Sequence, residues 1–202
     1  MATKEDILEQ IVEEYLLHQG FFVRHNIKFL PRKDHKEFVS NKDSNHSDID
    51  VLGYHPHRLG SDRVFAVSCK SWQGGFHPSY WLDAIKKQKK ISGREAWKSF
   101  RELVAPKWSE AFIDSVAKAT GTEKFTYVIA VAHVVGDKKA WEENIEFQSM
   151  IGGNPIRIIT FQDMISDINR ELRTTLAATE VGRMLQMFRA SGFVLHEKKN
   201  EK

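Results

Sequence analysis

The sequence has little cysteine, little net charge and no long apolar run. Cys69 is its only cysteine, which excludes an internal disulfide and fits a reducing compartment. The formal charge of +3, from 30 basic and 27 acidic residues, is too small to predict a nucleic-acid partner by itself. The longest mainly apolar run, residues 125–135, is far shorter than the ~20 residues of a membrane-spanning helix. Because charged residues rather than an apolar leader follow Met1, we expect a cytoplasmic protein without membrane contact.

The composition is that of an ordinary globular domain. A chain of 202 residues with 41% hydrophobic content is long enough to bury a core. Segments with strand periodicity alternate with segments of helical periodicity, and no internal repeat or linker interrupts them. We therefore predict one α/β domain over residues 1–202, with a helical C-terminal extension from about residue 161.

The periodicity also predicts where the individual elements lie. Strands are expected at residues 21–29, 47–52, 64–71, 125–132 and 155–160. Helices are expected at residues 3–20, 79–91, 107–119, 138–150, 161–176 and 181–192, and residues 40–47 read as a polar loop. Thr3 with Asp6 predicts the start of the first helix, and Thr160 with Asp163 predicts another helix start. The last two helices either pack on the domain or form a helix-turn-helix reader.

The most informative stretch is a pair of strands with polar residues at alternate positions. In residues 47–52, Asp48 and Asp50 share one face of a strand, and in residues 64–71, Ser68 and Lys70 do the same. The connection over residues 53–62 is rich in turn formers, so the second strand can fold back beside the first. Carboxylates and an ammonium group would then meet above a sheet, which is an arrangement that can handle a metal ion and a phosphate.

This pattern resembles the PD-(D/E)xK nuclease superfamily, which has the restriction-endonuclease-like fold. Asp50 matches the acidic residue of the first strand, and Lys70 matches the lysine of the second. Ser68 stands where the second carboxylate normally stands, which is the main departure. The resemblance spans roughly residues 5–132 and implies a mixed β-sheet with helices on both faces. It also implies Mg²⁺-dependent cleavage of DNA, with Mn²⁺ as a substitute, and it makes a homodimer one option.

The resemblance implies roles for these residues. Asp50 would bind the metal, the main-chain carbonyl of Cys69 would complete the ligand set, and Lys70 would orient the water and stabilise the phosphate. The hydroxyl of Ser68 offers an oxygen without charge, so it would hold Mg²⁺ more weakly than a carboxylate. Whether another carboxylate replaces it, or the site is degenerate, is left open by the sequence.

Asp48 and Glu9 are the main candidates for the replacement carboxylate. Asp83, on the helix expected after the second strand, is a poorer candidate because it sits opposite the apolar stripe of that helix. Asp48 lies two residues before Asp50 on the same strand face. In nucleases of the Holliday-junction-resolvase type, a Glu about three helical turns before a helix-ending Gly reaches the metal site, and Glu9 precedes Gly20 at that spacing. The competing interpretation of Glu9 is a solvated residue on the flank of its helix.

Basic and aromatic residues follow the second strand. Residues 86–107 contain eight basic residues against two acidic ones, although such a run is often only a solvated face. The basic residues predicted to contact a DNA backbone are Lys86, Lys90, Arg94 and Lys98. The aromatic residues that either stack on bases or pack in the core are Trp72, Tyr80, Trp81, Trp97 and Trp108.

Two other functions fit the same motif. A member of the same fold could bind nucleic acid after losing its chemistry at Ser68. The Asp48–Asp50 strand is also similar to the metal-binding strand of polymerase-β-type nucleotidyltransferases. That family needs a Gly-Ser pair upstream and a carboxylate on a later strand, and neither is present at those places. The histidines lack the spacing of a structural zinc site.

Overall fold

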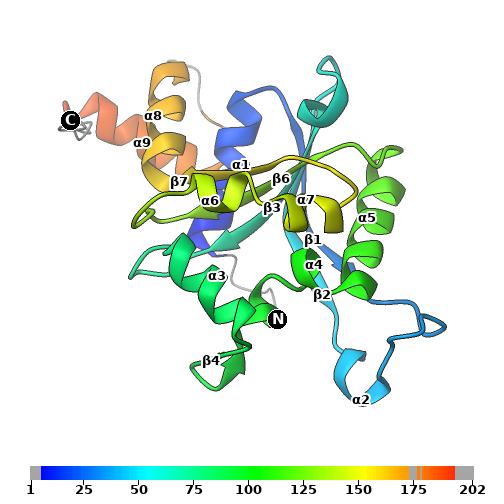
Figure 1. Ribbon diagram of the computed structural model, residues 1–202. Helices are drawn as coiled ribbons and strands as arrows, with labels where there is room; N and C mark the ends of the chain where they lie inside the picture. The colour runs from blue at the N-terminus through cyan, green and yellow to red at the C-terminus, as the bar shows by residue number, and fades with distance from the viewer. Residues whose placement is uncertain (1–5, 173–176, 178, 194–202) are drawn as a thin grey trace.

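The computed structural model describes residues 6–172, 177 and 179–193. Within these residues the centre of the molecule is a mixed five-stranded sheet in the order β1-β2-β3-β6-β7 (Figure 1). β1 and β3 both run antiparallel to β2, whereas β3, β6 and β7 run parallel to one another. The sheet strands are β1 (Phe22–Phe29), β2 (Ser47–Tyr54), β3 (Val64–Lys70), β6 (Thr126–Val131) and β7 (Ile156–Thr160). All five lie where the periodicity predicted strands.

Helices cover both faces of the sheet, as predicted for an α/β domain. The helices are α1 (Ile7–His18), α2 (Ser40–Asp43), α3 (Pro78–Lys86), α4 (Arg101–Val104), α5 (Pro106–Thr120), α6 (Lys139–Glu142), α7 (Ile145–Met150), α8 (Phe161–Glu171) and α9 (Glu180–Ala190). On one face, α1, α8 and α9 pack on Val51, Val67 and Val128. On the other face, α3 to α7 pack on Ala66, Tyr127 and Ile129. The alternation of side chains along each strand separates the two cores.

Several of the predicted helices differ in extent from the observed ones. The first helix begins at Ile7, because Asp6 is its N-cap and accepts the Leu8 N–H at 2.9 Å. Thr3, the predicted cap, lies outside the described residues, as does part of the predicted helix 161–176. Residues 138–150 form α6 and α7 instead of one helix, because the Asn144 side chain caps a new start at Phe147 N.

The predicted helix over residues 79–91 ends early. α3 stops at Lys86, and a two-stranded hairpin of β4 (Lys90–Ile91) and β5 (Arg94–Glu95) follows. The two residues of its turn, Ser92 and Gly93, both have positive φ, as in the tight turns that match strand twist. This local turn overrides the helical spacing that Ile91 shares with the residues before it. A 3₁₀ helix, η2 (Ala96–Ser99), leads from the hairpin to α4, and another, η1 (Gly60–Arg63), precedes β3.

The predicted loop over residues 40–47 contains α2, which is tied to α5 by a buried ion pair. Lys107 Nζ lies 2.6 Å from Asp43 Oδ2, and the two side chains are 13% and 3% exposed. The same carboxylate oxygen accepts the Val39 N–H at 2.7 Å. Burial of a paired charge therefore holds this segment against the body of the domain.

The C-terminal helices belong to the core of the α1 face. Thr160 and Asp163 form the predicted capping box at the start of α8. The side chain of Glu14, buried in α1, accepts a hydrogen bond from Thr179, which is the N-cap of α9. Val181 and Leu185 are buried in the same cluster as α1. No helix in the described residues is long and apolar enough to cross a membrane.

Candidate active site at the divergence of β2 and β3

The site forms where two neighbouring strands separate. The β2–β3 ladder runs from Tyr54 opposite Val64 to Val51 opposite Val67, and it ends there. Beyond that point β3 continues beside β6 as far as Lys70. The Cys69 N–H donates to Asp50 Oδ2 at 2.6 Å, so a carboxylate takes the place of a main-chain acceptor. The gap between the strands opens into a pocket of about 300 Å³.

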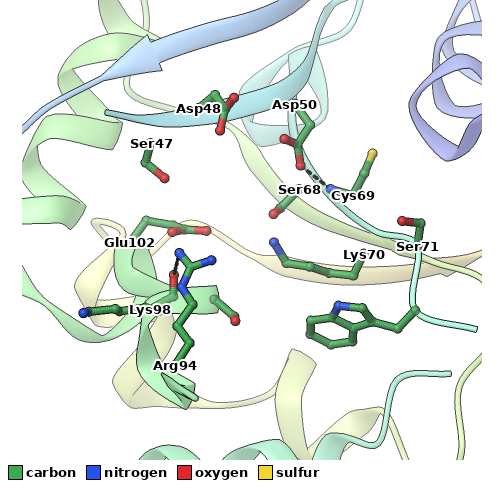
Figure 2. Close-up of a pocket in the computed structure, with 12 residues that line it drawn as sticks. Ser47, Asp48, Asp50, Ser68, Cys69, Lys70, Ser71, Arg94, Lys98 and Glu102 are labelled. Carbon is green, nitrogen blue, oxygen red and sulfur yellow. Dashed lines mark hydrogen bonds between the residues drawn. The ribbon is translucent and has the colours of Figure 1, made fainter. Parts of the chain in front are cut away.

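The pocket has an acidic wall formed by Asp48 and Asp50, and the opposite wall carries cations together with the carboxylate of Glu102 (Figure 2). Its carboxylates are Asp48 and Asp50 of β2 and Glu102 of α4. Its cations are Lys70 of β3, Arg94 of β5 and Lys98 of η2. Figure 2 shows the carboxylates of Asp48 and Asp50 on one side and the ammonium group of Lys70 pointing into the space below them. Strands and helices that are far apart in sequence thus bring both signs of charge to one hollow.

The expected meeting of Asp50 and Lys70 is present in this geometry. Both side chains line the pocket, and both residues are partly buried. Lys70 Nζ lies 5.4 Å from the centroid of the Phe100 ring, which attracts and positions the ammonium group. Ser68, which is 7% exposed, also lines the pocket. The two strand motifs therefore share one face, as their alternation predicted.

The positive charges around the Asp50 carboxylate do not compensate for its burial. Burial raises the pKa of Asp50 to about 6. The Lys70 ammonium and the Cys69 N–H oppose this rise in pKa, while the nearby Asp48 and Glu102 add to it. A cation bound beside Asp50 would relieve this imbalance.

Glu102 is the site residue that the sequence reasoning missed. It is 6% exposed and accepts a hydrogen bond from the Tyr127 hydroxyl of β6. Burial, followed by the charge of Glu102, raises the pKa of Tyr127 well above its ordinary value, so the hydroxyl stays a donor. The Ser68 side chain has the opposite effect on the Tyr127 pKa. In the sequence, Glu102 is only one of two acidic residues in a basic stretch.

Glu9 lies beside the site but does not line the pocket. It is a partly buried residue of α1. Burial raises the pKa of the Cys69 thiol, and the charges of Asp50 and Glu9 add to that rise, so Glu9 is near the thiol. Asp6, the N-cap of α1, bonds to a residue that lines the pocket, because its Oδ2 accepts a hydrogen bond from Ser71 Oγ at 2.5 Å. The N-terminus of α1 is thereby fixed to the rim of the site.

Several lysines of the basic stretch, residues 86–107, already form ion pairs within the protein. Four of its lysines lie within 2.7 Å of a carboxylate oxygen. These pairs are Lys87 and Lys89 with Asp83, Lys98 with Glu95, and Lys107 with Asp43. Of the four residues predicted to contact DNA, Arg94 and Lys98 line the pocket. Lys86 borders a separate hollow between α3, α4 and α7, and Lys90 is exposed on β4.

The donor set suits a hard divalent ion. Mg²⁺ takes oxygen ligands and commonly uses one or two carboxylates together with waters. The carboxylates of Asp50 and Asp48 offer such oxygens, and Cys69 lines the pocket beside them. Among the described residues there is no group of three or more His, Cys, Asp or Glu side chains that could hold a metal ion by themselves. The site fits Mg²⁺ bound largely through water and does not fit a closed zinc centre.

No protein-family model, curated protein or solved structure matches this chain. The chemistry of the pocket is therefore the basis for a functional assignment.

Proposed function

We propose that the protein is a Mg²⁺-dependent nuclease that hydrolyses DNA phosphodiester bonds on a restriction-endonuclease-like core. The observation that carries this proposal is the convergence of Asp50 and Lys70 in an open pocket where β2 leaves β3. The fold assignment is supported by the sheet order, with three antiparallel strands followed by two parallel ones. It is further supported by α1 and α5, which cover opposite faces.

The two walls of the pocket match the two charges of the reaction. Asp50 and Asp48 would hold Mg²⁺, together with the carbonyl of Cys69. When bound, the ion lowers the pKa of a water and neutralises charge on the phosphate. Lys70, fixed against Phe100, would orient the attacking water and stabilise the negative charge that grows on the phosphate. Arg94 lines the wall opposite Asp48 and Asp50 and would hold a phosphate oxygen.

Glu102 accounts for the missing carboxylate at Ser68. It lines the same pocket, and its charge contributes to the raised pKa of Asp50. Its hydrogen bond from Tyr127 fixes the orientation of the carboxylate. Asp48 and Glu102 would therefore add to the pocket negative charge that a serine at position 68 does not carry.

Cleavage assays with matched variants test the proposal. Plasmid, branched and single-stranded DNA are incubated with Mg²⁺ or Mn²⁺, and the rate of strand cleavage is measured. Asp50→Asn and Lys70→Ala should each lower the rate by about a hundredfold or more, because each removes a charge that acts in the transition state. The controls Asp83→Asn and Lys124→Ala remove the same charges outside the pocket and should cleave normally. Cleavage at the wild-type rate by either pocket variant would contradict the proposal.

A second candidate is a nucleic-acid-binding module that has lost its chemistry. It is favoured by the uncharged Ser68 and by the absence of a three-ligand metal cluster in the described residues. Binding of DNA without cleavage in either metal would support it. Transfer of a nucleotide from a nucleoside triphosphate would instead support a nucleotidyltransferase.

A further inference from the structure

A second hollow adjoins the candidate active site. It has a volume of about 360 Å³, and Trp72 and Ser99 line both hollows. Its other walls are aromatic side chains that follow β3 and the turn of the β4–β5 hairpin. The side chains that matter here are Trp72, Tyr80, Trp81, Ile91 and Ser92. A ligand in the charged pocket could extend into this aromatic hollow without leaving the protein surface.

The rings of the hollow form an open aromatic platform. Trp72 and Trp81 stack with centroids 4.5 Å apart and an interplanar angle of 13°. Trp81 is 8% exposed and anchors this pair in the core. Tyr80 meets the Trp81 ring edge-on at 81° and is itself 51% exposed. Exposed rings of this kind bind flat, π-rich groups such as nucleobases.

The loop between β3 and α3, which carries Trp72 and leads to Tyr80 and Trp81, is held in place before any ligand binds. The Phe76 N–H donates to the His133 carbonyl, and the Val135 N–H donates to the Phe76 carbonyl, both at 2.8 Å. Gly75 has φ of +81°, and a Cβ there would lie 2.4 Å from the His133 ring. A close approach to the segment after β6 therefore fixes this loop. A preformed site loses less conformational freedom on binding.

We propose that the aromatic hollow binds the base of an unpaired nucleotide next to the scissile phosphate. In a continuous duplex both faces of each base are covered by its neighbours, so only an unpaired or displaced base can stack on Tyr80. The preferred substrate is then DNA that is single-stranded or carries an unpaired nucleotide at the cleavage point. This inference rests on the proposed function, because that function places the scissile phosphate in the adjoining pocket.

The test uses a readout that does not require cleavage. A single-stranded oligonucleotide containing aminopurine, a fluorescent base analogue that is quenched on stacking, is titrated with the protein in EDTA. Wild type should quench it, and Tyr80→Leu should weaken binding about tenfold, which is within the range for loss of one base–aromatic stack. Tyr80→Phe keeps the ring and should restore quenching. Phe22→Ala removes a ring that is 69% exposed on the edge strand β1 and serves as the control.

The outcomes separate the two proposals. Unquenched aminopurine with wild type, or equal binding by wild type and Tyr80→Leu, would overturn the base site, whatever the cleavage assay shows. Quenching that depends on Tyr80 in a protein that cleaves no DNA with Mg²⁺ or Mn²⁺ supports the base site and overturns only the nuclease. In an active enzyme, Tyr80→Leu should slow cleavage of single-stranded DNA about tenfold more than cleavage of intact duplex. Equal slowing of both substrates would count against the base site.

Discussion

Asp50→Asn should make the protein more stable while it removes the carboxylate on which the proposed chemistry depends. The amide oxygen of Asn can still accept the Cys69 N–H, which donates to Asp50 at 2.6 Å, so the substitution removes charge with little change of shape. Burial raises the pKa of Asp50 from an ordinary 3.8 to about 6. The ionised carboxylate therefore destabilises the folded state relative to the unfolded chain.

The size of this stabilisation and its dependence on pH follow from the two pKa values of Asp50. A difference of about 2 corresponds to at most about 3 kcal/mol, because each pKa unit is worth about 1.36 kcal/mol. The folded protein holds this proton more tightly than the unfolded chain does. The destabilisation by the ionised Asp50 carboxylate is consequently absent below pH 3.8, grows between pH 3.8 and about 6, and is constant above that range. Asp50→Asn should therefore raise the free energy of unfolding by up to about 3 kcal/mol at neutral pH and leave it unchanged near pH 3.8.

Urea unfolding of wild type and Asp50→Asn in EDTA, repeated from acidic to neutral pH, measures this difference directly. Asp83→Asn is the matched control, because hydrogen bonds from Lys87 and Lys89 hold the pKa of Asp83 below its ordinary value. The same substitution there should give no gain at neutral pH. The reasoning is refuted if Asp50→Asn is no more stable than wild type at neutral pH, or if its gain does not shrink on acidification.

Two further substitutions test the structure around the site. Lys107→Met should cost about 3 kcal/mol in urea unfolding, because it leaves the buried Asp43 carboxylate without its cation. Lys118→Met, on the exposed side of the same helix, is its control, and a similar cost for both would contradict the role of the ion pair. Ser68→Glu should bind Mg²⁺ at least about tenfold more tightly by calorimetry, because a charged oxygen replaces a neutral one. An unchanged affinity would contradict the restriction-endonuclease-like assignment.

The position of the central pair could be read from the sequence because it depends on local rules. Side chains alternate along a strand, which put Asp50 on the same face as Asp48 and Lys70 on the same face as Ser68. A turn-rich connection of suitable length made β2 and β3 antiparallel neighbours. These two rules are enough to bring Asp50 and Lys70 into one hollow.

Glu102 could not be found in this way because its place depends on contacts that are distant in sequence. α4 has four residues, which is too short for a periodic pattern, and its carboxylate is held by Tyr127 of β6. The count of basic residues overlooks contacts of the same kind. Lys107 is paired with Asp43, which is 64 residues earlier in the chain, so its charge is already neutralised. A count of charged residues does not show which lysines are paired with a carboxylate or which are buried.

The energetics of Asp50 bear on why a carboxylate occupies this position. The Cys69 N–H lies beyond the end of the β2–β3 ladder and has no main-chain acceptor on β2. The Asp50 side chain accepts its hydrogen bond instead. A neutral amide would satisfy the same N–H without the cost of burying a charge. The hydrogen bond alone therefore does not explain an acid whose burial raises its pKa to about 6 beside two other carboxylates. A ligand that places a cation on the acidic wall and an anion on Lys70 would neutralise both walls together, and a metal-bound phosphodiester has that distribution of charge.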